Sequence, residues 1–589
     1  MKALARLNKF FWKYRLRFFS GILFILISTY FSLRPIDLVG RGLDFAKFAP
    51  VHNLNRDVVV HILLQFGMEI ILYTLAYGCF LFLNRQTIIV MSRLIEFDMK
   101  NEVFEQYQKL DQKFYKTNNT GDLMNRISED IGRVRMYVGP AVMYATTTLI
   151  TLIMTIYFMF RADLEFSLYV LAPLPVLAFS IYYVSNLINK KSLKVQEQLS
   201  LLSTSAQETF SGIRVVKAFA REETMQERYA ADSNEYLKRN MSLAKTESLF
   251  QPFMMLLIGV SIIITIFIGG SKAIDGKISE GMITAFVLFV IRLTWPIASL
   301  GWVTSLVQRA AASQQRINEF LQTKSEIVNP TEEALNLKGK IEFKNVSFVY
   351  PDSGVKALNE LSFLVEPGQS VAFVGKTGSG KSTIATLMVR LFDASSGEIK
   401  IDNKDIRKIN LDELRDRTGY VPQEVFLFSE TIAGNIGFSA HDLREIESNR
   451  SAIEQAAKDA AVYSNIMEFP EKFDTLVGER GVTLSGGQQQ RISIARAILK
   501  QPQILIFDDC LSAVDTETED EILGNLRRIM KGKTTVIISH RVSSVRNADQ
   551  IIVLDEGKMV ESGTHASLIE QNGVYRELYR KQVEELKGK

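Results

Sequence analysis

Long apolar stretches alternate with polar segments over the first half of the chain. Six of these stretches have roughly 20 or more mostly apolar residues, the length that a helix needs to cross about 30 Å of hydrocarbon. They lie near residues 18–40, 58–84, 137–160, 163–187, 250–272 and 281–304. Helices of a large soluble core keep a polar face, and these stretches largely lack one. The pattern therefore predicts six transmembrane helices.

Lysine and arginine are concentrated in two segments between these stretches, 85–136 and 188–249. Loops rich in these residues face the cytoplasm, which sets the orientation of the helices. Each segment has roughly 50 residues or more with helical patterning, and a structureless loop of that length is uncommon. We therefore expect the membrane helices to continue into the cytoplasm as two helical hairpins, the intracellular loops. Each hairpin is broken by one turn-like segment, at 116–121 and 211–212, and such a tip can contact another domain.

The two ends of the membrane half define the predicted domain organisation. The first 17 residues are basic and amphipathic, which indicates an elbow helix near 3–15 on the inner leaflet. Six crossings return the chain to the cytoplasm, where a polar, proline-containing linker follows at 322–340. We therefore predict a transmembrane domain at 1–321 and a soluble domain at 341–589.

The soluble half contains a phosphate-binding loop in the context that such a loop requires. Residues 341–350 alternate as a strand does, and a second strand, 370–374, leads directly into a P-loop pattern at 375–382. Its glycines let backbone amides surround phosphate oxygens, and the following helix presents its positive end. Lys381 is expected to reach the β- and γ-phosphates, and the Ser382 hydroxyl to coordinate Mg²⁺. The predicted nucleotide contacts are Gly375, Lys376, Thr377, Gly378, Ser379, Gly380, Lys381, Ser382 and Thr383.

Three further segments supply candidate chemistry around this loop. Asp508 follows four apolar residues of a strand, where a carboxylate that binds Mg²⁺ is expected, and Asp509 comes next. His540 ends another apolar strand, although a strand-end histidine that only makes a hydrogen bond is the alternative. Leu484-Ser-Gly-Gly-Gln488 precedes a helix and forms a second anion-binding turn. One nucleotide needs only one such loop from its own chain, so the second turn suggests a nucleotide held by another copy.

Composition excludes several classes of protein. The chain has 589 residues, 47% hydrophobic and 23% charged, so it is neither disordered nor collagen-like. The two cysteines, Cys79 and Cys510, lie in different contexts and imply no disulfide framework. A formal charge of +4 is too small to indicate a nucleic-acid partner.

The order of the motifs resembles the ATPase domain of ATP-binding cassette (ABC) transporters. The matching segments are the P-loop, Gln423 in Val-Pro-Gln, Leu484–Gln488, Asp508, Ser512-Ala-Val-Asp515 and His540. Six preceding membrane helices in the same chain are similar to exporter half-transporters of the bacterial multidrug and lipid type. Thr120–Arg126 and Gly212–Phe219 are similar to the intracellular-loop segments of that family, so the resemblance covers essentially the whole chain. It implies a multi-pass exporter of the cytoplasmic membrane, driven by ATP and active as a dimer, with its ATPase domain in the cytoplasm.

The resemblance also implies a role for each matching residue. Tyr350 would stack on adenine, Gln423 would sense Mg²⁺ and the attacking water, and His540 would hold the γ-phosphate. The implied Mg²⁺ ligands are Ser382, Gln423 and Asp508. Residues that would serve the nucleotide across the dimer interface are Ser485, Gly486, Gly487, Gln488 and Asp515. The segment 477–481 resembles one that contacts the intracellular loops of the partner.

Asp509 departs from the family pattern, which usually has a glutamate as the general base directly after the Mg²⁺-binding aspartate. Aspartate is one methylene shorter, so its carboxylate would fall roughly 1 Å short of the water, and such a misplacement can cost about 100-fold in rate. Cys510 is also atypical of the family, and aspartate at position 509 is similar to one subunit of heterodimeric exporters whose own ATP site hydrolyses poorly. We therefore expect a heterodimer with a second half-transporter, and a homodimer that runs slowly on Asp509 is the alternative. The intact His540 and Gln423 weaken the heterodimer interpretation.

The sequence does not select one substrate. The aromatic and methionine content of the helices fits an amphipathic drug-like compound or a lipid. Arg292, Trp295, Glu69 and His61 lie in predicted membrane helices and are candidate pathway residues, because a charge in the bilayer is costly and usually faces a cavity. Internal salt bridging is the alternative for these residues. Two other functions stay open: a mainly ATP-binding partner subunit that hydrolyses poorly, and a nucleotide-gated channel or regulator, which the lack of a long insertion between the halves disfavours.

Overall fold

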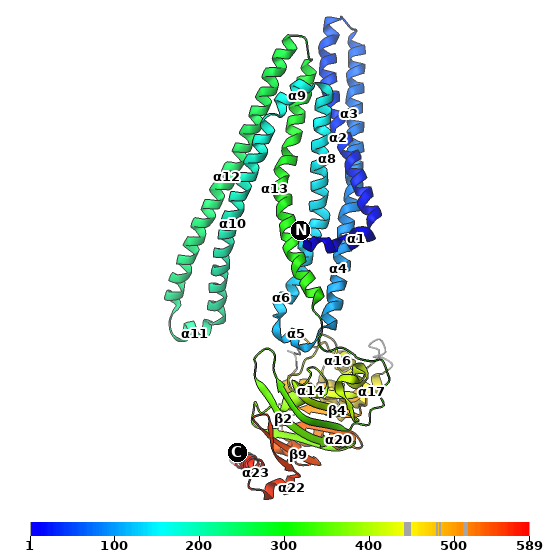
Figure 1. Cartoon of the computed structure of the whole chain (residues 1–589), viewed down its shortest axis with the longest axis vertical. Coiled ribbons are helices and arrows are strands. Elements are labelled where there is room, and N and C mark those ends of the chain that lie inside the picture. The colour runs from blue at the N-terminus through cyan, green and yellow to red at the C-terminus, as the bar shows by residue number, and fades with distance from the viewer. Residues whose placement is uncertain (1, 441–448, 479–480, 482–483, 511–515, 588–589) are drawn as a thin grey trace. The chain divides into compact units, whose positions relative to one another are not determined.

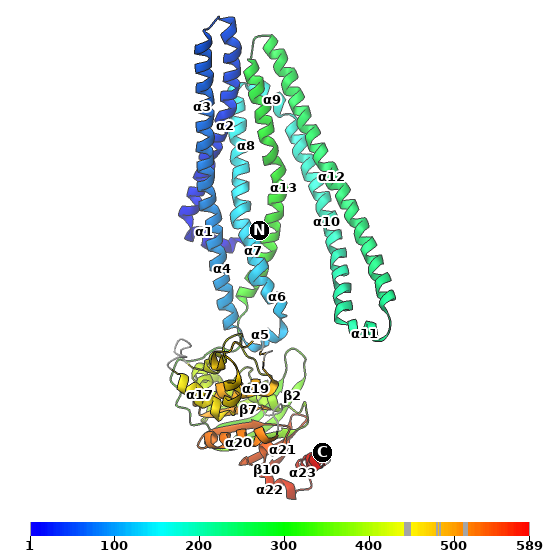
Figure 2. The same ribbon diagram turned by 180° about the vertical axis from the view of Figure 1, so that it is seen from behind.

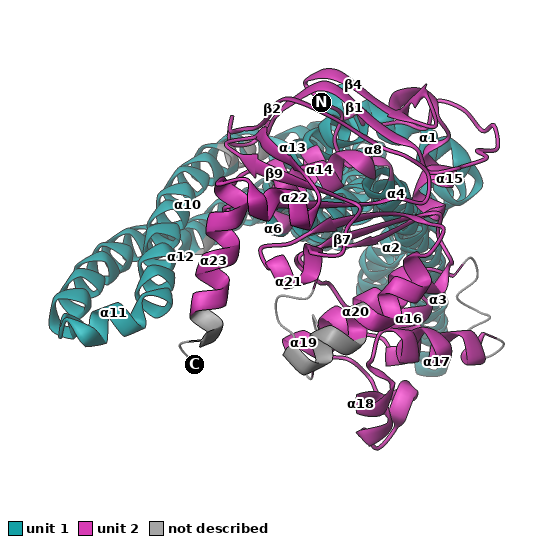
Figure 3. Ribbon diagram, turned by 90° about the horizontal axis from the view of Figure 1, so that it is seen from below, with its two compact units in different colours: residues 1–108, 121–322 teal, residues 109–120, 323–589 magenta. Residues whose placement is uncertain are grey.

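The computed structural model describes residues 2–440, 449–478, 481, 484–510 and 516–587, and the chain divides into two compact units. Unit 1 comprises Met1–Gln108 and Gly121–Gln322, and unit 2 comprises Lys109–Thr120 and Thr323–Lys589 (Figure 3). Unit 1 is helical, and the strands lie in unit 2. The chain therefore combines a helical membrane domain with an α/β domain, as the sequence predicts.

Within the described residues, five helical segments are long and apolar enough to cross a membrane. These segments are Arg15–Val51, Arg56–Lys109, Thr120–Ala162, Glu222–Ile274 and Glu280–Gln322, and they contain five of the six predicted spans. The remaining predicted span, 163–187, is divided between α9 (Leu164–Leu171) and α10 (Pro173–Ser211). Pro173 begins α10, a position where the missing N–H of proline removes no helical hydrogen bond.

The other helices of unit 1 follow the predicted pattern in chain order. They are a 3₁₀ helix (Lys2–Leu7), α1 (Asn8–Lys13), α2 (Arg15–Val51), α3 (Arg56–Asn84), α4 (Val90–Lys109), α6 (Thr120–Asn125), α7 (Ile131–Met136), α8 (Val142–Ala162), α11 (Ile213–Ala218), α12 (Glu222–Ile274) and α13 (Glu280–Gln322). Three π-helical turns, Arg85–Ile89, Arg126–Asp130 and Tyr137–Ala141, connect α3 to α4, α6 to α7 and α7 to α8.

The second predicted hairpin is formed by α10 and α12, which run antiparallel and are joined through α11 (Figures 1 and 2). Gly212 caps the end of α10, where the turn-like segment was expected. Both figures show this pair diverging from α8 and α13 toward α11. Phe210, Val215 and Phe219 near the tip are exposed. The tip of this hairpin therefore presents apolar surface that unit 1 does not bury.

The start of α13 lies very close to α2. The Gly281 N–H donates a hydrogen bond of 2.7 Å to Asp44 Oδ1, and a Cβ built on Gly281 would lie 2.0 Å from the Gly40 carbonyl oxygen. A side chain at Gly281 would therefore force the two helices apart. The same pair of helices is joined further along by a hydrogen bond of 2.9 Å from Arg292 to Ser32.

Unit 2 contains two sheets. The first is antiparallel, in the order β2 (Lys356–Val365), β1 (Ile341–Val349), β4 (Ser396–Ile401) and β5 (Lys404–Asp405). The second has the order β10 (Lys558–Gly563), β9 (Gln550–Asp555), β3 (Ser370–Gly375), β8 (Thr534–Ile538), β7 (Ile504–Asp508) and β6 (Thr418–Val421). All pairs from β9 to β6 are parallel, and β10 pairs antiparallel with β9. The carboxyl ends of β3, β8, β7 and β6 therefore meet at one edge, where ligands bind in open α/β sheets.

Helices cover these sheets and complete unit 2. They are α5 (Gln112–Thr117), α14 (Lys381–Met388), α15 (Leu411–Asp416), α16 (Ile432–Gly437), α17 (Arg450–Asp459), α18 (Tyr463–Glu468), α19 (Gly486–Leu499), α20 (Thr516–Met530), α21 (Val542–Val545), α22 (His565–Glu570) and α23 (Val574–Lys587). One hydrophobic core joins both sheets to α14 through residues such as Phe343, Phe373 and Ile384. A second core packs Ile453 and Ile494 against the six-stranded sheet.

Helix α5 belongs to unit 2, although it comes from the tip of the first predicted hairpin. Asp111 caps α5 and also accepts hydrogen bonds from the backbone N–H of Glu326 and from the Ser325 hydroxyl, at 2.7 and 3.2 Å. Lys113 forms an ion pair with Glu326. The segment 109–120 is thus attached to the first residues after α13, outside the soluble range that the sequence predicts.

Candidate functional site

The P-loop connects β3 to α14, as the sequence predicts. Its Lys381 side chain is buried and folds back over the loop. The ammonium donates hydrogen bonds of 2.9 Å to the Gly375 carbonyl and 2.8 Å to the Lys376 carbonyl, and lies 3.4 Å from the Ser379 hydroxyl. Three oxygen atoms therefore hold one cation at the mouth of the loop, where an anionic phosphate could take their place.

Two glycines give the loop its shape. Gly380 has a φ of +97°, and a Cβ there would lie 2.2 Å from the Ala357 carbonyl oxygen. Gly378 has a φ of +81° with open space around it. Only glycine enters this left-handed region without strain. Glycine at these two positions therefore lets the loop turn tightly, as binding of a phosphate by backbone amides requires.

Asp508 ends β7 in a buried position two strands away from the P-loop strand. Its Oδ1 accepts a hydrogen bond of 2.9 Å from the Ser382 hydroxyl at the start of α14. The pKa of Asp508 is raised to about 6, first by burial and also by the nearby Asp509, while Ser382 and Lys381 oppose the change. Burial also lowers the pKa of Lys381 to about 8, against the attraction of both carboxylates. Burial therefore disfavours the charged forms of Asp508 and Lys381. A bound cation would stabilise the Asp508 carboxylate, and a polyphosphate would stabilise the Lys381 ammonium.

The Ser382 and Asp508 oxygens fit a Mg²⁺ ion. Mg²⁺ usually takes one or two protein oxygens and completes its shell with phosphate and water. A hydroxyl and a carboxylate oxygen already 2.9 Å apart are of that kind. Among the described residues there is no group of three or more His, Cys, Asp or Glu side chains that could form a protein-only metal site.

Asp509 follows β7 directly and lies beside the P-loop. Its exposed fraction is 9%, its φ is +46°, and its N–H donates a hydrogen bond of 2.8 Å to the Ile538 carbonyl of β8. Aspartate tolerates this left-handed conformation better than most residues. The backbone is thus tied to the neighbouring strand, and this tie limits how far the short side chain can be carried toward a substrate.

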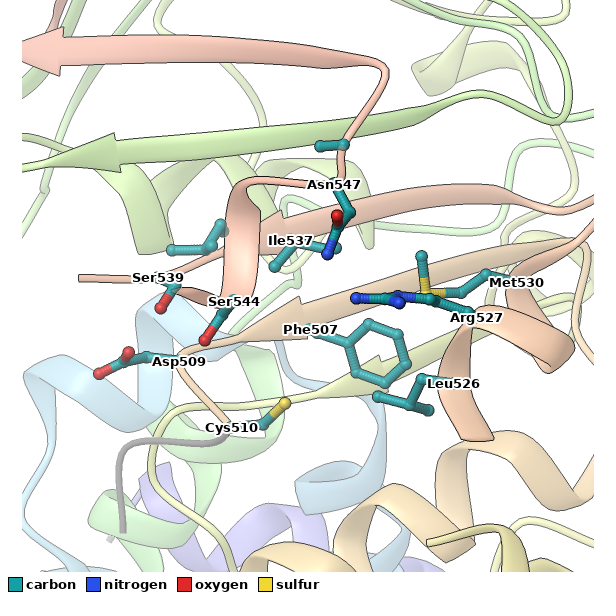
Figure 4. A pocket seen from close by; sticks show the side chains of 12 residues that line it. Phe507, Asp509, Cys510, Leu526, Arg527, Met530, Ile537, Ser539, Ser544 and Asn547 are labelled. Carbon is teal, nitrogen blue, oxygen red and sulfur yellow. The ribbon is translucent and has the colours of Figure 1, made fainter. Parts of the chain in front are cut away.

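A largely apolar cavity of about 100 Å³ adjoins Asp509 (Figure 4). Figure 4 shows the Asp509 carboxylate at the edge of the cavity, directed away from Arg527 and Met530. The residues that line the cavity are Phe507, Asp509, Cys510, Leu526, Arg527, Met530, Ile537, Ile538, Ser539, Ser544, Asn547 and Ala548. Cys510 is buried beside this cavity.

His540 follows β8, the strand between β3 and β7, two residues beyond its end. Burial lowers the pKa of its imidazole, and the Lys381 ammonium lowers it further, whereas Asp509 and a backbone hydrogen bond with Gly375 act in the opposite direction. These interactions place the imidazole among the P-loop and the acidic pair. Gln423 lies in the loop after β6, next to β7, and its side chain is exposed. The carboxyl edge thus brings together most of the predicted catalytic residues.

Tyr350 lies just beyond β1 and reaches the P-loop helix. Its hydroxyl is 3.0 Å from the Thr383 hydroxyl, and its ring packs edge to face with Phe392. The Lys116 ammonium of α5 lies 4.2 Å from the centre of the Tyr350 ring, a cation–π contact. Sequence reasoning missed Lys116. The only signal was the turn-like segment 116–121, which predicts a contact with another domain without naming the partner residue.

The predicted second anion-binding turn begins α19. Ser485 caps this helix: its hydroxyl accepts from the Gln488 N–H, and the Gln488 side chain accepts from the Ser485 N–H at 2.9 Å. Ser485 and Gly486 are exposed. Figure 3 shows α19 and α14 apart within unit 2, so the structure does not bring this turn to the P-loop of its own chain. Asp515, the rest of 511–515, and residues 479–480 of the segment 477–481 lie outside the described residues.

Comparisons with known families agree with this arrangement. The family described as the ABC transporter transmembrane region matches residues 16–297, and the family described as ABC transporter matches residues 358–512. The chain is 34% identical to a probable multidrug resistance ABC transporter ATP-binding/permease protein of Bacillus subtilis, over 98% of this chain and 97% of that one. It is 35% identical to an ATP-dependent lipid A-core flippase of Syntrophus aciditrophicus, over 88% of this chain and 85% of that one.

A solved structure has the same fold. The structure of a bacterial Atm1-family ABC exporter with ATP bound superposes with a TM-score of 0.78 and 27% sequence identity. The match covers 96% of this chain and 98% of that one. The similarity therefore extends over both units.

Proposed function

The chain belongs to the ABC transporter family, as a multi-span exporter with a cytoplasmic ATPase domain, and from this we propose how its site works. ATP binds at the carboxyl edge of the six-stranded sheet, with its phosphates in the P-loop and its adenine on Tyr350. The observation that carries this proposal is the convergence of Lys381, Asp508, Asp509 and His540 at that edge. The domains proposed are 1–321 with six transmembrane helices, a linker at 322–340, and the ATPase domain at 341–589.

Each residue at the edge has a separate task. The Lys381 ammonium leaves its carbonyl partners to bind the β- and γ-phosphates, and Ser382, Asp508 and Gln423 hold Mg²⁺. Mg²⁺, when bound, offsets the negative charge of the phosphates. Asp509 accepts a proton from the attacking water, and His540 donates a hydrogen bond to the γ-phosphate. Backbone amides of 375–383 complete the phosphate cradle.

Exchange of Lys381 tests this assignment in the full-length protein in lipid nanodiscs. Lys381→Ala should reduce Mg-ATP affinity by at least tenfold, because it removes the ammonium that the loop carbonyls hold at the mouth of the loop. Lys400→Ala is the matched control, since Lys400 pairs with Glu398 on the antiparallel sheet. Unchanged nucleotide affinity in Lys381→Ala would overturn the P-loop assignment.

Half-transporter exporters act as dimers, and we propose that Ser485, Gly486, Gly487, Gln488 and Asp515 serve the nucleotide of the second subunit. The exposed start of α19 and its distance from the P-loop of its own chain support this. The Ser485→Arg variant should impair hydrolysis at the Walker motifs of the other subunit while ATP binding by this chain stays unchanged. Loss of binding in this chain instead would mean that both turns serve one site.

We propose a heterodimer in which this chain holds ATP and hydrolyses it slowly. Asp509 is the observation that favours it, because the backbone tie to Ile538 keeps a short carboxylate in place. The second half-transporter would then carry the faster site, completed by Leu484–Gln488 of this chain. A homodimer that runs slowly on Asp509 is the second candidate.

The proposed cargo is an amphipathic compound, either drug-like or a lipid. The relatives named above as multidrug resistance and lipid A-core proteins support this class. ATP-dependent uptake of amphipathic probes into inverted membrane vesicles tests it, and uptake that Lys381→Ala leaves unchanged would contradict it.

A further inference from the structure

Arg292 is a cation deep in a predicted membrane span. It lies 12 residues after Glu280, the first residue of α13, which is about 18 Å along the helix at 1.5 Å per residue. The hydrocarbon core is about 30 Å thick, so the backbone of Arg292 lies nearer its middle than either surface. A charge at this depth is costly and usually faces a partner or a cavity.

The contacts of Arg292 carry no negative charge. Its Nη2 donates a hydrogen bond of 2.9 Å to the Ser32 hydroxyl of α2, and its guanidinium carbon lies 6.0 Å from the centre of the Tyr77 ring of α3. Its Nε is buried and has no hydrogen-bond partner among the residues that the structure describes. Within the part of the chain that the structure describes, no carboxylate lies within ion-pair distance of this guanidinium.

A second arginine in the same bundle differs from Arg292 in having a carboxylate beside it. Arg34 of α2 lies 3.7 Å from Asp37, one turn along the helix, and Asp37 also pairs with Arg41 at 2.9 Å. Glu69 does not compensate Arg292 in this way. It precedes Tyr77 on α3 by eight residues, about 12 Å along the helix, and its Oε1 accepts a hydrogen bond of 3.5 Å from the Gln65 side chain.

The surroundings of Arg292 fit an anion that carries an apolar body. Guanidinium has five N–H donors in a planar fork that matches a carboxylate or phosphate in two parallel hydrogen bonds. Ile291 and Trp295, before it and one turn beyond it on α13, are 51% and 70% exposed. An acidic head group would therefore meet the guanidinium while an alkyl or aromatic body lies along the exposed apolar side chains.

We propose that Arg292, with Ser32 and Tyr77, binds the acidic group of the transported compound, which is therefore an anionic amphiphile. This proposal rests on the export function proposed above and narrows its substrate class to carboxylate- or phosphate-bearing amphiphiles. An anionic ligand would supply the negative charge that the described residues do not place beside Arg292. Arg292 should therefore bind an anionic amphiphile more tightly than neutral or cationic analogues of equal length.

Tryptophan fluorescence offers a direct test, because Trp295 lies one turn from Arg292. In a background with Trp12→Phe and Trp302→Phe, Trp295 is the remaining tryptophan of the chain. The full-length protein, in phosphatidylcholine nanodiscs without ATP, is titrated with doxyl-labelled stearate, and quenching reports binding. Dodecyl phosphate and dodecyltrimethylammonium then compete with this probe.

Dodecyl phosphate should compete at least tenfold more strongly than dodecyltrimethylammonium. Arg292→Gln should abolish this preference, Arg292→Lys should retain part of it, and Arg34→Gln should leave it unchanged because Arg34 already has the Asp37 carboxylate beside it. Equal competition by both amphiphiles in the parent protein would overturn the proposal, even if Arg292→Gln fails to fold.

Two further measurements separate the possible sources of the anion and the two proposals. In nanodiscs with phosphatidylglycerol, weaker apparent binding of dodecyl phosphate would show that a bilayer phospholipid occupies the same site, and unchanged binding would point to a free amphiphile. Mg-ATP affinity is measured on the same samples. Normal ATP binding with equal amphiphile affinities would defeat only the anionic-substrate inference, whereas loss of ATP binding would concern the P-loop assignment.

Discussion

Lengthening the Asp509 side chain by one methylene should speed hydrolysis at this site. Asp509 is fixed by the 2.8 Å hydrogen bond of its N–H to the Ile538 carbonyl, so the carboxylate cannot advance by movement of the backbone alone. Glutamate extends the reach by about 1 Å, and an error of this size is worth about 100-fold in rate, or about 2.7 kcal/mol of activation free energy.

The backbone conformation sets a limit on this gain. With φ at +46°, position 509 lies in the left-handed region, which aspartate accepts more readily than glutamate. Such a conformation costs of order 1–3 kcal/mol when it is unfavourable, and any adjustment that relieves it moves the carboxylate. We therefore expect Asp509→Glu to raise the rate by about 10- to 100-fold, the upper value being the full effect of the methylene.

Single-turnover hydrolysis of ATP in the assembled transporter measures this effect at one site. Asp509→Asn is the control for the carboxylate and should reduce turnover of a heterodimer only mildly, whereas exchange of the partner's general base should nearly stop it. A purified homodimer that hydrolyses ATP well, loses almost all activity with Asp509→Asn, and gains nothing with Asp509→Glu would refute the reasoning. Asp509 would then be a competent base at its present length.

Three other predictions concern the same unit. Burial raises the pKa of Asp508 to about 6, so the nucleotide-free protein should lose on the order of 2–3 kcal/mol of stability as pH rises from about 4 to about 6. In thermal unfolding scans, Asp508→Asn should therefore raise the Tm at pH 7.5 but hardly change it at pH 4. Gly380→Ala should lower the Tm because its Cβ would lie 2.2 Å from a carbonyl oxygen at a φ of +97°, whereas Gly524→Ala, in α20 with open space, should be neutral or stabilising by about 0.5–1 kcal/mol. Lys116→Ala should raise ATP affinity by about two- to fivefold in nucleotide titrations if adenine replaces the ammonium on the Tyr350 ring, and a lower affinity would contradict this exchange.

Local patterns sufficed to predict the P-loop and most membrane helices. The run from strand to glycine loop to helix at 370–388 is contiguous, so its geometry follows from residues close together in the chain. Apolar length likewise predicts five spans directly. The division of 163–187 at Ala172 was not predicted, because the two prolines there were interpreted as tolerated within one membrane helix.

Features that depend on distant parts of the chain were not accessible in the same way. Burial and the approach of Asp509 and Lys381 set the pKa of Asp508, and these follow from the strand order β3-β8-β7. The neutral surroundings of Arg292 depend on how α13 meets α2 and α3. Lys116 and Tyr350 lie in segments that the sequence assigns to different domains, and no local signal pairs them.

The attachment of α5 to unit 2 has a consequence for the order of synthesis. Residues 109–120 leave the ribosome long before Thr323, with most of the membrane helices in between, and domains generally fold as units during translation. The contacts of Asp111 and Lys113 with Ser325 and Glu326 can therefore form only after the intervening membrane helices have been synthesised. A fragment that starts at 323 would lack these early residues, and adding 109–120 as a separate peptide should raise the temperature at which the fragment unfolds. The ATPase unit would thus be completed by a piece of chain made before most of the membrane domain exists.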